Sequence, residues 1–199
     1  MVIPTPEGGG AARTAPPWAE LGAEAKRERL LGAAGEVFAR EGIEAPMPAV
    51  AAAAGAGVGS VYRQFPSKED LLAALVVRRL DTVAADIEAA LAEKGGAWRA
   101  LVGLMWRLAD LQAADDVAAE AIATVSGHAE VATRAGLCER RLETLLDAAR
   151  AEGRLRADAS AADVRLVLAA VRATRRREPD GWRRMLELGL DGLAARTAS

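Results

Sequence analysis

Apolar residues recur along most of this chain at the spacing of three and four residues that marks one face of an amphipathic helix. The first such stretch begins near Gly22, and Gly42 is placed to end it as a C-terminal glycine. A later stretch, residues 71–91, keeps the same period and predicts one long helix. Ser67 and Asp70 lie just ahead of it at the spacing of a capping box.

Between these two helices lie two short apolar runs joined by a turn that contains Gly55 and Gly57. Pro46 and Pro48 fix the start of the first run, because proline is tolerated only in the first turn of a helix. Two brief helices with a glycine-containing turn have the outline of a helix-turn-helix. Residues 45–68 also contain no acidic side chain. This combination predicts contact with DNA.

The C-terminal part of the chain shows only helical patterns, with no alternating strand pattern, heptad or internal repeat. Its expected helices cover residues 98–111, 115–125, 129–152, 163–175 and 181–196. We therefore predict an all-α fold. An N-terminal three-helix module, which contains the helix-turn-helix, is joined by the long connector helix to a C-terminal helical domain.

Charge and composition narrow the class of protein. The formal net charge is −2, so binding to nucleic acid must come from local charge and backbone amides. Cys138 is the only cysteine, which excludes an intrachain disulfide and a zinc site built on cysteines. His128 is the only histidine and argues against a metal sensor. We expect neither a metal nor a cofactor.

The same features bear on location and on catalysis. The first residues lack the basic segment and apolar run of a secretory signal, and no stretch approaches the ~18 uncharged apolar residues that cross a bilayer. We expect a cytoplasmic protein without a membrane partner. An all-α enzyme finds no support, since the sequence offers no nucleophile beside a base and no carboxylates paired on one helix face.

Residues 29–75 resemble the DNA-binding module of the tetracycline-repressor (TetR) family of bacterial regulators. The pattern Ala-Ala-x-x-Val-Phe-Ala-x-x-Gly at residues 33–42 is one part of the resemblance. The other part is the stretch AVAAAAGAGVGSVYRQFPSKEDLLAAL at residues 49–75. The resemblance implies an all-α homodimer that binds double-stranded operator DNA with the third helix of each subunit, most often as a repressor.

The resemblance also implies roles for individual residues. Phosphate contacts fall to Ser60, Tyr62 and Lys68, and positions near base edges to Val58, Gly59, Arg63 and Gln64. Arginine and glutamine offer paired hydrogen bonds to guanine and adenine, and a tyrosine hydroxyl suits a phosphate oxygen. The alternative for Tyr62 is partial packing with an exposed tip.

Two positions depart from the family pattern. Family members usually carry serine or threonine where this chain has Pro46 and Gly57, and both hydroxyls would cap a helix and contact phosphate. Their loss keeps open a helical adaptor whose head no longer binds DNA. The basic cluster at residues 26–29 either faces phosphates, together with Arg63, or is an ordinary solvated face with Glu24 and Glu28.

For the C-terminal half, the resemblance implies a small-molecule effector of unknown identity whose binding opposes DNA binding through the long helix. Trp98, Met105 and Trp106 are large apolar residues at helical spacing, and with His128 they are our candidates for the effector pocket. The alternative for the first three is plain core. For His128, as for Cys138, the alternative is a residue without a ligand role.

The last two helices are the expected dimer surface, because two helices from each subunit can form a four-helix bundle on a two-fold axis. The predicted contacts are Val164, Val167, Leu168, Val171, Trp182, Leu186, Leu190 and Leu193. The alternative is that these residues form core within one subunit.

The chain is therefore divided into three parts. Residues 1–21 are expected to form a flexible tail, residues 22–67 the helix-turn-helix DNA-binding domain, and residues 68–199 the effector-binding and dimerisation domain. Within the tail, Arg13 is either an arm that reaches a DNA groove or part of a disordered leader.

Overall fold

The computed structural model describes residues 16–112 and 116–195, and within these ranges the protein is helical apart from an isolated antiparallel bridge between Leu155 and Ala194. The all-α prediction is confirmed. The elements are a 3-10 turn η1 (Trp18–Glu20) and the helices α1 (Ala23–Glu41), α2 (Met47–Ala54), α3 (Val58–Gln64), α4 (Lys68–Ala92), α5 (Ala97–Gln112), α6 (Asp116–Val125), α7 (Ala129–Ala151), α8 (Ala161–Arg177) and α9 (Trp182–Leu193).

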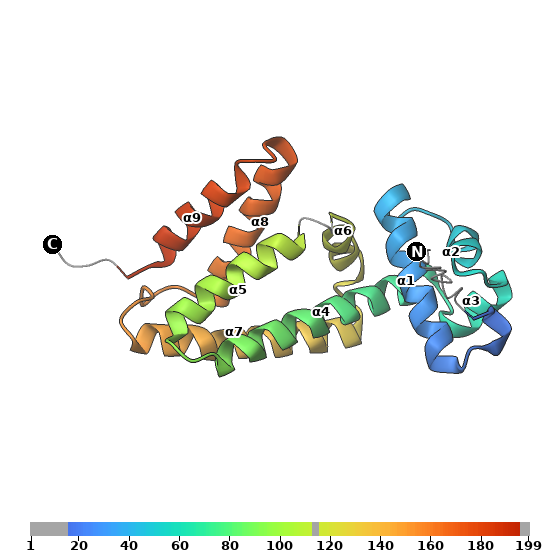
Figure 1. Ribbon diagram of the computed structural model, residues 1–199, viewed down its shortest axis with the longest axis horizontal. Coiled ribbons are helices and arrows are strands. Elements are labelled where there is room, and N and C mark those ends of the chain that lie inside the picture. Colours follow the sequence, from blue (N-terminus) through green and yellow to red (C-terminus); the bar gives the residue numbers. More distant parts are fainter. Residues whose placement is uncertain (1–15, 113–115, 196–199) are drawn as a thin grey trace, which may run out of the picture.

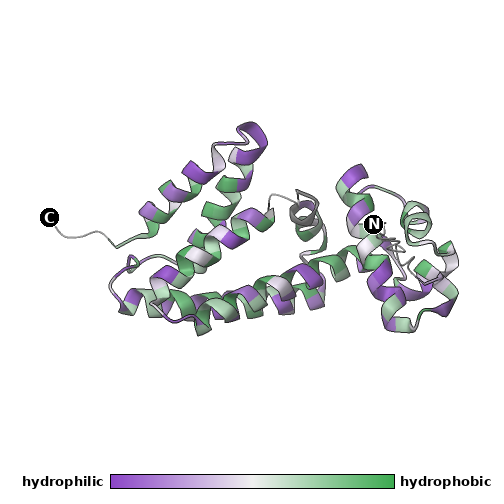
Figure 2. Cartoon of the chain, viewed as in Figure 1, coloured by the Kyte–Doolittle hydropathy of each residue, from purple (hydrophilic) through white to green (hydrophobic). Residues whose placement is uncertain are grey.

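The helices form two parts joined by α4 (Figure 1). At one end α1, α2 and α3 make a small head, and α4 leaves this head to run along α7. Helix α5 packs on both α4 and α7, while α8 and α9 form a pair that contacts α5. Helix α6 lies beside the joint and contacts α4 and α1. Figure 2 shows hydrophobic residues gathered where the helices face one another.

Local sequence signals set the helix ends that position the head. Gly55 ends α2 with φ 65° and ψ 33°, a left-handed conformation that favours glycine. Pro46 precedes α2 in an extended conformation. Helix α4 starts with the expected capping box, in which Ser67 Oγ accepts from the backbone N–H of Asp70 at 3.0 Å and Asp70 Oδ2 accepts from that of Ser67 at 3.0 Å.

The buried side chains form two cores, and α4 contributes to both. The head core contains Leu71 and Val77 from the first half of α4, together with Ala121 and Val125 from α6. The second core contains Ile87 from the other half of α4 and joins it to α5, α7, α8 and α9. By packing, the two parts therefore meet within α4, whereas the sequence placed the domain boundary between residues 67 and 68.

The N-terminal tail is partly described by the structure. Residues 16–21 belong to the predicted flexible tail, yet Trp18 packs against the head core and the carbonyl of Pro16 accepts a hydrogen bond from Arg29 at 2.7 Å. The described part of the tail is therefore docked on the head. Arg13 lies outside the described residues.

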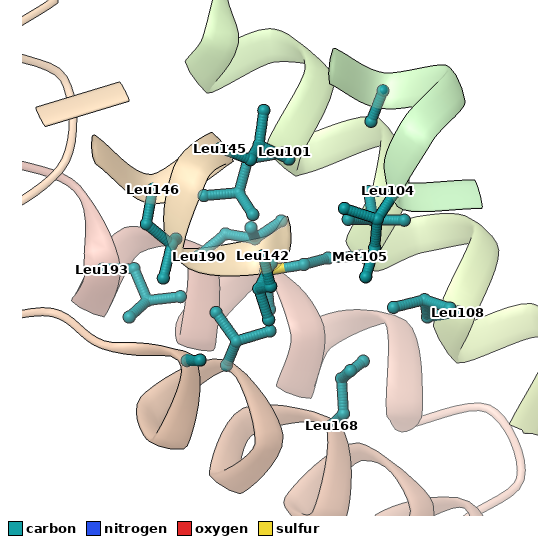
Figure 3. Close-up of a cluster of buried hydrophobic side chains, with 14 of the residues drawn as sticks. Leu101, Leu104, Met105, Leu108, Leu142, Leu145, Leu146, Leu168, Leu190 and Leu193 are labelled. Atoms are coloured by element: carbon teal, nitrogen blue, oxygen red, sulfur yellow. The ribbon is translucent and has the colours of Figure 1, made fainter. Parts of the chain in front are cut away.

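The α8–α9 pair is held by a close approach at a glycine. A Cβ atom at Gly189 in α9 would lie 2.4 Å from Val167 Cγ1 in α8, closer than side-chain atoms approach one another. Leu168 of α8 and Leu190 and Leu193 of α9 point into the second core beside Met105 (Figure 3). The facing sides of this pair are therefore packed within the subunit.

This packing predicts an unusual response to alanine in α9. Alanine is ordinarily about 0.5–1 kcal/mol more favourable than glycine inside a helix. Because the new Cβ would collide with Val167, we expect Gly189→Ala to lower the free energy of unfolding by about 1–3 kcal/mol. Gly192→Ala is the matched control, since a Cβ there meets nothing within 4 Å. Urea unfolding followed by circular dichroism measures both, and unchanged stability of Gly189→Ala would contradict the close approach.

Candidate functional site

Helix α3 presents one polar face because its other face is anchored in the head. Val61 has no exposed surface, and Phe65, which follows the helix, is 2% exposed. The opposite side carries Tyr62, with 46% of its surface exposed, and Arg63, which is also exposed. Neither α3 nor the turn before it contains a carboxylate. The buried face of this short helix therefore fixes the direction in which its polar side chains point.

The polar residues at the start of α3 contact one another. Arg63 Nη2 donates a hydrogen bond to Ser60 Oγ at 2.7 Å. Ser60 and Gln64 are half-buried, while Val58 and Gly59 are exposed at the first turn. Gly57 takes the N-cap position and has no side chain to bond the free backbone N–H groups of that turn. The N–H groups of Ser60 and Val61 donate to the carbonyl of Gly57. The donors open to an outside acceptor are therefore the backbone N–H groups of Val58 and Gly59.

Lys68 lies in the first turn of α4, shortly after α3 in the sequence. Its Nζ lies 3.4 Å from Glu44 Oε2, and the side chain of Glu44 is 92% exposed. An ion pair with so exposed a partner contributes little to stability, so another anion can replace Glu44 at low cost. The structure brings together the predicted positions Ser60, Arg63 and Gln64, with Lys68 at the head of the next helix.

Two residues of the basic cluster near the start of α1 stabilise the head, and a third lies beside α3. Arg27 lies over the ring of Phe65 at 4.6 Å, and Arg29 bonds the carbonyl of Pro16 at 2.7 Å, so both stabilise the head. Lys26 instead lines a recess of about 250 Å³ beside α3. The other lining residues are Trp18, Ala23, Ser60, Arg63 and Gln64.

Trp18 is a residue of this surface that the sequence analysis missed. It is half-buried, its ring lies 5.9 Å from Lys26 Nζ, and it lines the same recess as the polar residues of α3. In the sequence, Trp18 is a single aromatic residue shortly before the basic cluster at residues 26–29. Because it follows two prolines, the sequence predicts it to be part of the flexible tail.

The C-terminal part contains a second candidate site, an apolar recess of about 380 Å³ bounded by α4, α5, α6, α7 and α8. It is lined by Arg79, Leu80, Val83, Ile87, Leu108, Ile122, Ala135, Cys138, Glu139, Leu142, Val164, Arg165, Leu168 and Arg172. Two recesses of similar volume, about 450 and 430 Å³, each lie along a single helix and are surface grooves. Among these recesses of the described residues, the one between five helices has the apolar, concave lining typical of a small-molecule site.

None of the four predicted effector residues lines this recess. Met105 is completely buried in the second core (Figure 3). Trp106 packs edge-on against Trp182 with ring centroids 5.8 Å apart, and the backbone N–H of Trp98 donates to Glu152 at 3.0 Å. Trp98 and Trp106 are partly buried against the second core, and their contact with an effector stays a prediction.

His128 lies at the N-cap of α7, where its Nε2 is 3.8 Å from Asp70 Oδ1, so it adjoins the joint between the two parts. Cys138 does line the recess. Its Sγ donates to the carbonyl of Leu80 at 3.3 Å, and burial raises the pKa of the thiol, an effect that nearby Arg141 partly offsets.

Neither a membrane-spanning helix nor a metal-binding cluster occurs within residues 16–112 and 116–195. None of the helices in these ranges combines the length and the apolar character that a membrane span requires. The same residues contain no group of three or more histidine, cysteine, aspartate or glutamate side chains arranged to hold a metal ion.

The N-terminal candidate site lies in the part of the chain that matches a known protein family. Residues 30–75 match the family described as bacterial regulatory proteins, tetR family. A TetR transcriptional regulator from Streptomyces coelicolor is 30% identical, the match covering 86% of this chain and 99% of that chain with a TM-score of 0.63. This chain belongs to the TetR family.

Two more solved structures support the TetR fold. A TetR transcription regulatory protein from Mycobacterium vanbaalenii is 28% identical, covers 85% of this chain and 95% of its own, and has a TM-score of 0.60. The regulator FadR from Bacillus subtilis, in complex with stearoyl-CoA, is 20% identical, with 83% and 98% covered and a TM-score of 0.63. No curated protein matches the chain. As a TetR protein, the chain is a DNA-binding transcription regulator from a non-enzymatic family.

The residues predicted to join two TetR subunits are inside one subunit. All except the half-buried Val167 are buried, and Val167 itself packs against Gly189. The buried members are Val164, Leu168, Val171, Trp182, Leu186, Leu190 and Leu193. Within this one subunit these side chains have almost no exposed surface, and their role in joining two subunits stays a prediction. The outer sides of the two helices instead expose Leu166 and Leu188.

Restoring the hydroxyl that TetR proteins usually carry at position 57 is expected to strengthen DNA binding. A Cβ at Gly57 meets nothing within 4 Å and the backbone is extended, so Gly57→Ser fits without strain. We expect a gain of about 0.5–1.5 kcal/mol in binding free energy on every DNA sequence, from one added hydrogen bond to phosphate. Gly57→Ala is the matched control in a titration of fluorescent duplex DNA. A serine variant that binds no better than the alanine variant would contradict phosphate contact at this end of α3.

Proposed function

We propose that this TetR-family regulator binds operator DNA as a homodimer, represses transcription there, and is released when a small molecule occupies its C-terminal part. The exposed face of α3 is the observation that supports DNA contact most directly. Tyr62 and Arg63 lie on that face, opposite the buried Val61 and Phe65. Val61 and Phe65 fix the rotation of the helix and therefore the direction of its polar groups.

The proposed contacts follow from the chemistry of each side chain. Arg63 exchanges its bond to Ser60 for the paired acceptors of a guanine edge, while Gln64, Val58 and Gly59 lie near neighbouring bases. The remaining polar groups, Ser60, Tyr62 and Lys68, bind phosphates and set the register of the helix in the groove. Lys68 exchanges the exposed Glu44 for a phosphate in the same way.

The homodimer is proposed to form through the outer sides of α8 and α9. On α8 the exposed residues Ala162, Leu166, Ala169 and Ala173 repeat at intervals of four, three and four, which places them on one face. Leu166 is 67% exposed, and Leu188 on α9 is 50% exposed. Small residues beside large apolar ones allow the same helices of a second subunit to pack closely across a two-fold axis.

Release by a ligand is supported by two elements that touch both the recess and the head. Helix α6 places Ile122 in the wall of the recess and Val125 in the head core. Helix α4 lines the recess with Val83 and Ile87, while Leu80 packs against both cores. A ligand that shifts either helix changes the position of the head and, reciprocally, operator binding changes affinity for the ligand. The FadR structure with stearoyl-CoA shows that this fold admits a small molecule.

Sequence-dependent DNA binding separates a regulator from a helical adaptor. We expect Arg63→Ala to relax discrimination at one base pair by about 1–3 kcal/mol, because it removes a contact to a base edge. Tyr62→Phe removes a phosphate contact and should weaken binding to all sequences about equally. Arg40→Ala, an exposed arginine at the end of α1, is the control that changes neither property.

Mobility-shift titrations across a salt series measure both effects on operator and scrambled duplexes. Wild-type binding is expected to weaken steeply as salt rises, since counterions released by phosphate contacts are bound again. Loss on all sequences alike for Arg63→Ala would refute its base-contacting role. Binding that is equal on operator and scrambled DNA would favour the adaptor.

Substitutions on α8 and α9 should separate the dimer surface from the core. We expect Leu166→Asp and Leu188→Asp to give folded monomers in sedimentation velocity and to lose operator affinity, because each places a charge in the apolar contact. Leu168→Asp should unfold the C-terminal part instead, because that side chain lies in the second core. Leu91→Asp, at a similarly exposed leucine on α4, is the control. Dimers that persist in both outer-face variants would contradict this surface.

A further inference from the structure

The recess in the C-terminal part has a chemistry specific enough to indicate its ligand. We propose that it binds an amphipathic carboxylate of roughly a dozen non-hydrogen atoms in all, with an apolar body and an anionic head group held by Arg79 and Arg172. That this ligand regulates DNA binding rests on the proposed function. Binding of the ligand to the recess does not depend on the proposed function.

The walls of the recess account for the apolar body. Helix α4 contributes Leu80, Val83 and Ile87, and α8 faces them with Val164 and Leu168. The volume of about 380 Å³ lies at the lower end of the range of small-molecule pockets, ~300–1,000 Å³. With about 30 Å³ for each water-sized group, it holds roughly a dozen non-hydrogen atoms. A medium-length alkyl chain fills such a space and satisfies its apolar lining.

The charged groups of the recess account for the anionic head. Glu139 is paired with Arg165 at 3.1 Å, so these two charges neutralise one another. Arg79 and Arg172 line the same recess and are half-buried, and neither has a hydrogen bond or ion pair among the described residues. A guanidinium removed from water gains most from a carboxylate that accepts two parallel hydrogen bonds.

Arginines that face neighbouring helices elsewhere in the bundle behave differently. Arg134 on α7 pairs with Asp81 on α4 at 3.0 Å, and Arg141 on α7 pairs with Glu88 on α4. The surface between α4 and α7 is thus charge-balanced outside the recess. Arg79 and Arg172 lack such a carboxylate among the described residues, and an anionic ligand in the recess completes their pairing.

Cys138 also lines the recess. Burial raises the pKa of its thiol, and the thiol donates to the carbonyl of Leu80. A neutral thiol neither attacks the ligand nor repels its carboxylate. It therefore belongs to the apolar wall.

Isothermal titration calorimetry with decanoate and its neutral analogue methyl decanoate tests the proposal on the full chain. We expect decanoate to bind one molecule per subunit. Arg79→Gln and Arg172→Gln should each weaken decanoate about tenfold by removing a charge-assisted hydrogen bond, without changing the binding of methyl decanoate. Arg140→Gln, on the exposed side of α7 and outside the recess, is the matched control and should bind decanoate as the wild type does.

A variant that fills the recess tests the location independently. Val83→Trp should abolish decanoate binding while circular dichroism and the unfolding midpoint show that the chain is folded. Decanoate binding that survives Val83→Trp would overturn the site. Equal binding of decanoate and methyl decanoate in the wild type and both glutamine variants would overturn the anionic head group.

The outcomes also separate this inference from the proposed function. Decanoate binding that depends on Arg79 and Arg172 but leaves operator affinity unchanged supports the ligand site and contradicts release by a ligand. Operator binding by a chain that takes up no decanoate at millimolar concentration overturns the ligand site and leaves DNA binding intact.

Discussion

Helix α4 belongs to two hydrophobic cores at once, and the arrangement of the rest of the molecule depends on this. Leu71 and Val77 are buried among the helices of the head, Ile87 is buried in the C-terminal part, and Leu80 contacts both cores. An α-helix transmits displacement along its length because each residue is fixed by backbone hydrogen bonds to the next turn. The head therefore cannot rotate freely on the C-terminal part. Any change in their relative position must repack side chains along α4 or α6.

The sequence predicted the order and type of the helices because the signals that determine them are local. Apolar periodicity, prolines at helix starts and glycines at helix ends located each helix within a few residues, and Ser67 and Asp70 form the predicted capping box. The polar face of α3 was predictable for the same reason, since Val61 and Phe65 are four residues apart and must share the buried side. Side chains of a short helix with one buried face have few possible directions.

The sequence could not show which element a buried face packs against. The apolar stripes of α8 and α9 indicated burial correctly, and the structure places Leu168 and Leu190 in the core of their own subunit (Figure 3), while Leu166 and Leu188 are exposed. The recess depends on contacts between helices distant in sequence, so nothing in the sequence indicated that Arg79 lines it. An arginine at the edge of an apolar stripe has the pattern of an ordinary surface residue. Only tertiary packing reveals that it lines a recess.

Two copies of α3, carried by a symmetric dimer, are proposed to bind a specific DNA sequence. Selection from a pool of random duplexes, followed by sequencing of the bound fraction, tests it most directly. A two-fold dimer that inserts one helix per subunit into the major groove predicts an enriched inverted repeat, with half-sites separated by about one helical turn, roughly 10 base pairs, or a multiple of it. A bound fraction that shows no enriched motif, or one unpaired half-site, would contradict the account.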